Sequence, residues 1–174
     1  LISQLYAVRQ DDDSYLSVAA FDIQGLRPGD DDRTFPTVAP LIEGRWSPDA
    51  RVAGGRVRLR ANAVALERDL SPSNTAATYV PGLDSRRVVA QAEWRRTFTT
   101  RAGVRLEPFV NLRADAYSLS DVPLEAYGGR TETRAMGTVG ADLSWPFYRR
   151  FNNVTAVLEP LVQVMASPRP EQIQ

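Results

Sequence analysis

The fold is decided by the stretch from Val104 to Tyr117, which reads VRLEPFVNLRADAY. Its even-numbered positions are apolar throughout, whereas its odd-numbered positions carry Arg, Glu, Phe, Asn, Asp and Tyr. Because side chains alternate across a strand, this stretch predicts a strand with one apolar face and one largely polar face. Strands of soluble sandwiches usually run for about 5 or 6 residues. A membrane strand needs about 9 to 11 residues, apolar toward lipid and polar toward the lumen, and this stretch is long enough.

Composition excludes several classes of protein. The 174 residues predict a single domain or part of one, and no run approaches the roughly 18 apolar residues of a membrane helix. Cysteine and histidine are absent, which argues against disulfides, most zinc sites and the commonest general base. The 21 basic residues, all Arg, balance 21 acidic residues. With no net charge to attract a polyanion, we expect no nucleic-acid partner.

Similar alternation recurs along the chain and predicts an all-β fold. We expect an antiparallel meander of about eight long strands that forms part of a large outer-membrane β-barrel. The expected strands are 3–9, 15–24, 37–46, 56–66, 86–98, 104–117, 135–145 and 154–166. Pro108 and Pro160 fall inside two of them, and because proline donates no ladder hydrogen bond, we expect weak pairing there.

The connections favour the same architecture. Short turns are expected after Gln10, Trp46, Thr99 and Pro146, and long loops after Gln24, Arg68 and Leu119, the last running from 118 to 134. Alternation of short turns with long loops is typical of outer-membrane barrels. Six aromatic residues lie near the short turns, where an interfacial girdle belongs. They are Tyr15, Trp46, Phe98, Trp145, Phe147 and Tyr148.

Arginines on the polar positions are the candidate binding residues. Arg56, Arg58 and Arg60 share one face of an expected strand, and Arg105 and Arg113 occupy the polar face of the 104–117 strand. Guanidinium groups bind phosphate through two parallel hydrogen bonds, although a row of arginines is also typical of a solvated face. Glu107 and Glu159 could in principle form a catalytic carboxylate pair, but without a histidine or lysine base we expect no enzyme, cofactor or metal site.

Several stretches resemble the LptD family of lipopolysaccharide-assembly proteins. They are QGLR at 24–27 with the acids that follow it, FPTVAPLI at 35–42, GGRV at 54–57 leading to LERD at 66–69, and LEPLVQ at 158–163. Their order matches that family's barrel domain across nearly the whole chain, and residues 1–174 are therefore expected to be an internal fragment of a transmembrane barrel.

This resemblance implies a role in delivering lipopolysaccharide to the cell surface at the outer membrane, without enzymatic activity. It also implies several partners: lipopolysaccharide, membrane lipid, an LptE-type lipoprotein plug, and a periplasmic Lpt bridge reached through an N-terminal domain outside this sequence. The arginines at 56, 58, 60, 105 and 113 are the expected lumen contacts. Two alternatives stay open on the residues alone, namely a soluble or surface β-sandwich that binds carbohydrate and another outer-membrane channel, receptor or enzyme barrel.

Overall fold

The computed structural model describes residues 1–72, 80–120, 130–168 and 171–173. Strands dominate these residues, together with one short 3-10 helix, η1 (Asp32–Thr34). No helix within the described part of the chain is long and apolar enough to cross a membrane. The strands are β1 (Ile2–Gln10), β2 (Ser14–Ile23), β3 (Thr37–Trp46), β4 (Arg56–Glu67), β5 (Asp84–Arg95), β6 (Phe98–Thr99), β7 (Arg105–Ser120), β8 (Arg130–Ser144), β9 (Phe147–Phe151), β10 (Val154–Leu158), β11 (Leu161–Ala166) and β12 (Glu171–Ile173).

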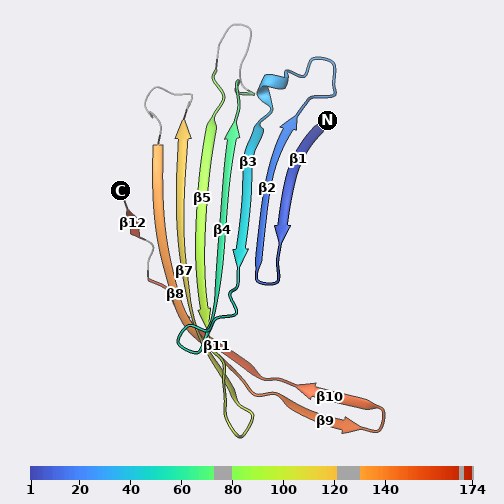
Figure 1. Ribbon diagram of the computed structural model, residues 1–174, viewed down its shortest axis with the longest axis vertical. Helices are drawn as coiled ribbons and strands as arrows, with labels where there is room; N and C mark the ends of the chain where they lie inside the picture. The colour runs from blue at the N-terminus through green and yellow to red at the C-terminus, as the bar shows by residue number, and fades with distance from the viewer. Residues whose placement is uncertain (73–79, 121–129, 169–170, 174) are drawn as a thin grey trace.

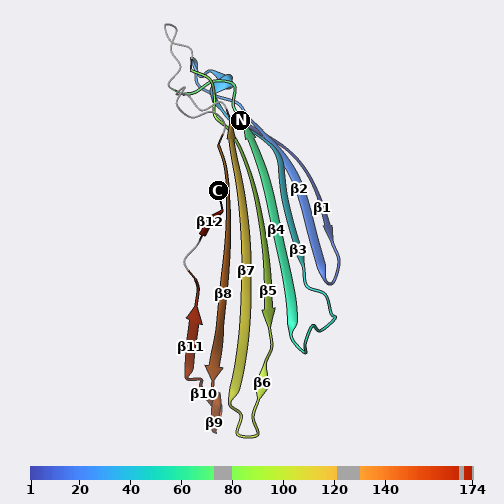
Figure 2. The same ribbon diagram turned by 90° about the vertical axis from the view of Figure 1, so that its left-hand side faces the viewer.

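The main sheet is an antiparallel meander. Its strands follow the order β1-β2-β3-β4-β5-β7-β8-β11, while β6 pairs with β7 and β12 pairs with β8. The strands lie side by side in one long, curved layer (Figures 1 and 2). This arrangement confirms the predicted all-β meander of about eight strands.

Cross-strand register gives this sheet two distinct faces. Leu112 of β7 lies opposite Ala92 of β5 and Gly137 of β8, whereas Arg113 lies opposite Gln91 and Met136. The same parity continues through β4, where Leu59 faces Ala92 and Arg60 faces Gln91. We call the side that carries Leu59, Ala92 and Leu112 the apolar face, and the side that carries Arg60, Gln91 and Arg113 the polar face.

Burial on the two faces is the reverse of that in a soluble sandwich. Val88, Leu112 and Val139 of the apolar face are 53%, 55% and 54% exposed. The buried apolar residues within the strands described, Val89 and Phe109, lie instead among the polar-face positions. A sandwich buries its apolar face against a second sheet. The exposed apolar face therefore disfavours the sandwich alternative.

Prolines coincide with the interruptions of pairing. The β2–β3 and β3–β4 registers shift around Pro40, and the gap between β5 and β6 lies opposite Pro108. Pro146 separates β8 from β9, and Pro160 separates β10 from β11. Because proline has no N–H to donate, each of these positions lacks a ladder hydrogen bond, and pairing is interrupted there on at least one side, as the sequence predicted for Pro108 and Pro160.

Three details of the sequence prediction are wrong. The expected strand 154–166 is divided into β10 and β11, and β10 pairs with β9 in a separate two-stranded hairpin that projects beyond the main sheet (Figure 1). The expected turn after Pro146 is thus largely strand β9. Strands β7 and β8 also extend into the expected loop 118–134, whose centre, 121–129, lies outside the described residues.

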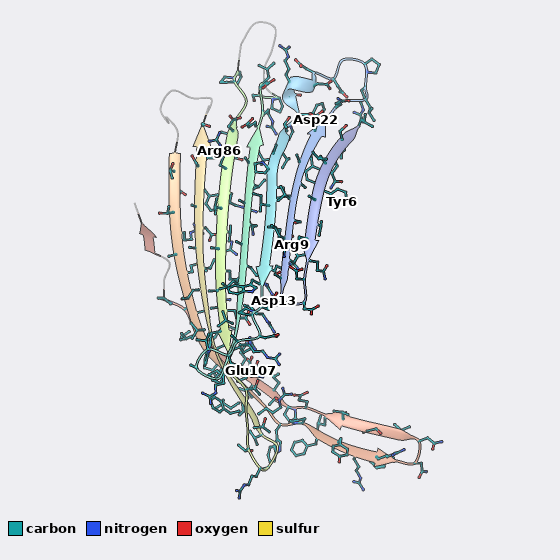
Figure 3. The ribbon with its side chains drawn as sticks, viewed as in Figure 1. Tyr6, Arg9, Asp13, Asp22, Arg86 and Glu107 are labelled. Carbon is teal, nitrogen blue, oxygen red and sulfur yellow. The ribbon has the colours of Figure 1, made fainter. Side chains whose placement is uncertain are left out.

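The connections between strands fall into two groups, one at each end of the sheet. The 11–13, 47–55 and 96–104 connections and the β9–β10 hairpin lie at one end of the sheet, which we call the short-turn end (Figure 1). At the other end of the sheet, which we call the long-loop end, β2 is followed by β3, β4 by β5 and β7 by β8. Figure 3 shows Glu107 near the short-turn end and Arg86 near the long-loop end.

Candidate functional site

All five candidate arginines belong to the polar face, but the structure divides them into two groups. Arg56 and Arg58 lie opposite Arg95 and Glu93 of β5, and Arg105 lies opposite Ser144 of β8. These three line one pocket near the short-turn end. Arg60 and Arg113, which both lie opposite Gln91, line a second pocket farther along the sheet.

The first pocket, which we call the basic pocket, has a volume of about 460 Å³. That volume falls within the range of small-molecule sites, about 300 to 1,000 Å³. Five arginines and two glutamates contribute to its lining, so positive charge is in excess. Its lining residues are Arg51, Arg56, Arg58, Glu93, Arg95, Thr97, Arg105 and Glu107.

Arg95 organises the carboxylates of this pocket. Its Nη1 donates to Glu107 at 2.6 Å and to Asp142 at 2.9 Å, and its Nε donates to Glu93 at 3.3 Å. The guanidinium also lies 5.0 Å from the ring centre of Phe109, which is close enough for a cation–π contact. One partly buried arginine thus joins acids from β5, β7 and β8.

The same carboxylates are bound by further donors. Thr97 Oγ1 donates to Glu107 at 2.6 Å, and Gln163 Nε2 donates to Asp142 at 2.7 Å. Arg58 lies 3.5 Å from Glu93. Glu93, Glu107 and Asp142 are therefore each bound by a cation or a hydrogen-bond donor, chiefly by Arg95.

The basic pocket has three further arginines, Arg51, Arg56 and Arg105. Among the residues that the structure describes, none of the three has a carboxylate within salt-bridge distance. Arg56 lies directly opposite Arg95 in the register, and like charges in that position repel one another. The carboxylates gather around Arg95, and none of them lies within salt-bridge distance of Arg56.

Two of the three arginines of the second pocket are paired with acids, whereas Arg60 has no carboxylate of the described residues within salt-bridge distance. Arg113 Nε and Nη2 both bind Asp115, at 3.0 Å and 2.8 Å for the closest oxygen of each, and Arg45 binds Glu43 through Nε at 3.0 Å. Arg45 also lies over the ring of Tyr15 at 5.4 Å. The volume of this pocket is about 200 Å³, less than half that of the basic pocket.

Arg51 and Arg95 also line the basic pocket, although neither was among the binding residues predicted from the sequence. Arg51 lies in the 47–55 turn, where no strand pattern could indicate its direction. Two residues of β5 and its extension hold this turn: Trp94 Nε1 donates to the carbonyl of Val52 at 2.8 Å, and Arg96 Nη1 donates to that of Ala53 at 2.9 Å. Arg95 did carry a signal, since it alternates with Gln91 and Glu93 on the polar positions of its strand.

The family model described as "LPS transport system D", LptD, matches residues 1–174, the whole chain. The chain belongs to the LptD family. This is an outer-membrane family whose role is the transport and assembly of lipopolysaccharide. A search of curated proteins found no match to the chain.

Tryptophans of this LptD-family chain recur at the short-turn end. Trp46 of β3 donates to Asp13 in the β1–β2 turn at 3.1 Å, and Trp145, just after β8, donates to the Ala102 carbonyl in the 96–104 connection at 3.0 Å. With Trp94, each indole N–H binds the turn of the preceding hairpin. Tyr15 departs from the predicted girdle, because it pairs with Arg45 on the polar face.

The structure does not bring Glu107 and Glu159 together as a catalytic pair. Glu107 is bound by Arg95 and Thr97, whereas Glu159 lies in the link between β10 and β11. Within the described ranges, no three acidic side chains gather as a metal site. The polar face of this LptD-family chain thus offers hydrogen-bond donors and positive charge.

Proposed function

We propose that this chain is an internal segment of an LptD barrel in the cell outer membrane, where it takes part in delivering lipopolysaccharide to the surface without catalysing a reaction. The match to the family over residues 1–174 supports the transport role. The distribution of burial supports the membrane placement, because the exposed apolar face has the character of a lipid-facing surface.

Strand lengths support the same placement. Strands β4, β5, β7 and β8 contain 12, 12, 16 and 15 residues, and a tilted strand needs about 9 to 11 residues to cross the hydrocarbon region. The sheet does not close on itself within the described residues. Because an open edge is unfavourable in a bilayer, further strands of a larger barrel would pair with β1 and β11.

The polar face would line the lumen and contact the head group of lipopolysaccharide. The candidate contacts are Arg56, Arg58, Arg60, Arg105 and Arg113. Lipopolysaccharide carries phosphate, for which guanidinium is a suitable ligand. An LptE-type lipoprotein inside the barrel and a periplasmic Lpt bridge joined through an N-terminal domain complete the proposed set of partners, and membrane lipid covers the apolar face.

Replacing the three arginines of β4 tests the transport role. In the full-length protein, Arg56→Gln/Arg58→Gln/Arg60→Gln should slow the appearance of new lipopolysaccharide on the cell surface, because lumen substitutions alter transport more than assembly. Pulse labelling of new lipopolysaccharide, followed by its extraction from the cell surface, measures delivery. A difference in gel mobility between unheated and heated samples shows that the barrel has assembled.

Arg149→Gln/Arg150→Gln in β9 provides a control for loss of exposed arginine charge away from the polar face of the main sheet. Normal delivery by an assembled β4 triple variant would refute the proposed role of the row. Slow delivery by the control as well would show that the effect comes from general loss of charge.

A further inference from the structure

We propose that the basic pocket is a discrete binding site for a phosphate group, held by Arg51, Arg56 and Arg105. The proposal rests on the proposed function for the natural source of that group, a phosphorylated lipid head group. It goes further in two ways. It assigns phosphate binding to one pocket of the polar face, and it adds Arg51 of the 47–55 turn to the arginines that bind. The pocket's volume of about 460 Å³ accommodates a phosphate with part of the sugar that carries it.

Positive charge is in excess in the basic pocket, which five arginines and two glutamates line. Glu107 is shared by Arg95 and Thr97, and Glu93 is shared by Arg95 and Arg58. No carboxylate of the described chain lies within salt-bridge distance of Arg51, Arg56 or Arg105. An anion bound between these three guanidiniums would relieve the repulsion between Arg56 and Arg95, which lie opposite each other.

The positions of the three arginines are fixed by the fold. The three arginines come from three separate segments, namely the 47–55 turn, β4 and β7, so they converge on the pocket from different sides. The turn that carries Arg51 is held by the hydrogen bonds from Trp94 and Arg96. Gly55 lies so close to the Trp94 indole that a Cβ there would overlap it, and Gly54 has a φ of +75°. These contacts set the direction of the turn before a ligand arrives.

The second pocket shows what a structural arginine cluster looks like in the same sheet. Arg113 binds both oxygens of Asp115, and Arg45 binds Glu43, so these charges are satisfied internally. Arg60 is the one arginine of this pocket without a carboxylate of the described residues within salt-bridge distance, compared with three such arginines in the basic pocket, and the second pocket is also smaller. The contrast predicts that an anion prefers the basic pocket to the second pocket.

A phosphate group suits the basic pocket better than a carboxylate. Each planar guanidinium can donate two parallel hydrogen bonds, and phosphate has enough acceptor oxygens to serve several forks at once. Two or more unpaired guanidiniums also match the charge of a phosphate monoester, which is about −1.5 to −2 at neutral pH. The pocket's place at the short-turn end puts this site near one mouth of the proposed barrel (Figure 3).

Binding of inorganic phosphate to the full-length protein in detergent tests the site directly. Isothermal titration calorimetry should detect phosphate binding to the parent protein. The double variant Arg56→Gln/Arg105→Gln should bind phosphate about tenfold or more weakly, since each substitution removes a charge-assisted hydrogen bond to the phosphate. Arg149→Gln/Arg150→Gln should bind as the parent does. Failure of the parent to bind phosphate, equal binding by Arg56→Gln/Arg105→Gln, or equal loss in the control would overturn the proposal.

Lipopolysaccharide and its enzymatically dephosphorylated form distinguish the sources of phosphate. If the site takes the lipid-linked group, Arg56→Gln/Arg105→Gln should reduce binding of intact lipopolysaccharide about tenfold or more and leave binding of the dephosphorylated form unchanged. Equal reduction for both forms would contradict phosphate recognition. Delivery in cells is measured separately: loss of phosphate binding with normal surface delivery would uphold the site and refute its part in the proposed transport function.

Discussion

At the scale of single residues, Arg95 contacts more carboxylates than any other arginine that the structure describes. Its guanidinium is about one-third exposed, yet it contacts carboxylates from three strands and the ring of Phe109. Glu107 and Asp142 are directly opposite each other on β7 and β8, where two like charges repel. The cation between them turns an unfavourable pair into a bridge across the sheet.

Removing this cation should destabilise the protein. Arg95→Gln leaves Glu93, Glu107 and Asp142 partly buried without their shared cation, and we expect a loss of about 1 to 3 kcal/mol in the free energy of unfolding, limited by residual solvent screening. Urea titration of the full-length protein in lipid vesicles measures it.

The matched control is Arg86→Gln. Arg86 lies on the same strand but is 66% exposed and 3.9 Å from Glu67, so its loss should change stability by less than about 0.5 kcal/mol. Equal effects of Arg86→Gln and Arg95→Gln would show that Arg95 has no special structural role.

At the scale of elements, the sequence predicted most strands because their two faces differ in chemistry. The β3 prediction, 37–46, matches the observed bounds, and β4 and β7 differ from their predictions only at the ends. Alternation alone could not predict how strands 147–151 and 154–158 pair, because each shows the same period in the main sheet or in a separate hairpin. Pro146 and Pro160 determine this pairing, because Pro146 interrupts the chain between β8 and β9 and Pro160 interrupts it between β10 and β11.

The connection between β2 and β3 gives an element-scale prediction that depends on pH. Asp31 caps η1, and Arg33 donates to its carboxylate through Nε at 3.0 Å and Nη2 at 2.8 Å. These side-chain bonds, with the Arg33 backbone N–H, lower the pKa of Asp31 below its usual value. A lowered carboxyl pKa stabilises the folded cap above the unfolded pKa, near 4, and that contribution disappears as pH falls through the folded pKa.

Carbon NMR of the Asp31 carboxyl group, followed against pH, should therefore give a midpoint below the usual value. Arg33→Gln should move the midpoint upward, because the main cause of the shift is removed. An unchanged midpoint in Arg33→Gln would show that the pair does not stabilise the cap.

At the scale of the whole molecule, the chain is a single curved sheet with an exposed apolar face and a charged face that is better packed. The meander was predictable because each strand lies beside its neighbour in sequence. The basic pocket was only partly predictable. Arg56, Arg58 and Arg105 could be placed on the polar face from alternation, but their separation from Arg60 and Arg113 depends on register, and Arg51 depends on turn contacts.

The central claim is that the apolar face contacts lipid and the polar face contacts water in the lumen. This chain contains no cysteine, so single cysteines for spin labels can be introduced along it without native competitors within it. Three sites report the apolar face, Val88, Leu112 and Val139, and three matched sites report the polar face, Gln91, Asn111 and Thr138.

Power-saturation measurements on the full-length protein in phospholipid vesicles give the accessibility of each label to oxygen, which concentrates in the bilayer, and to a water-soluble nickel complex. We predict that labels at 88, 112 and 139 meet oxygen more than nickel, and that labels at 91, 111 and 138 show the reverse. Greater oxygen accessibility at the polar-face sites, or no difference between the two sets, would contradict the account.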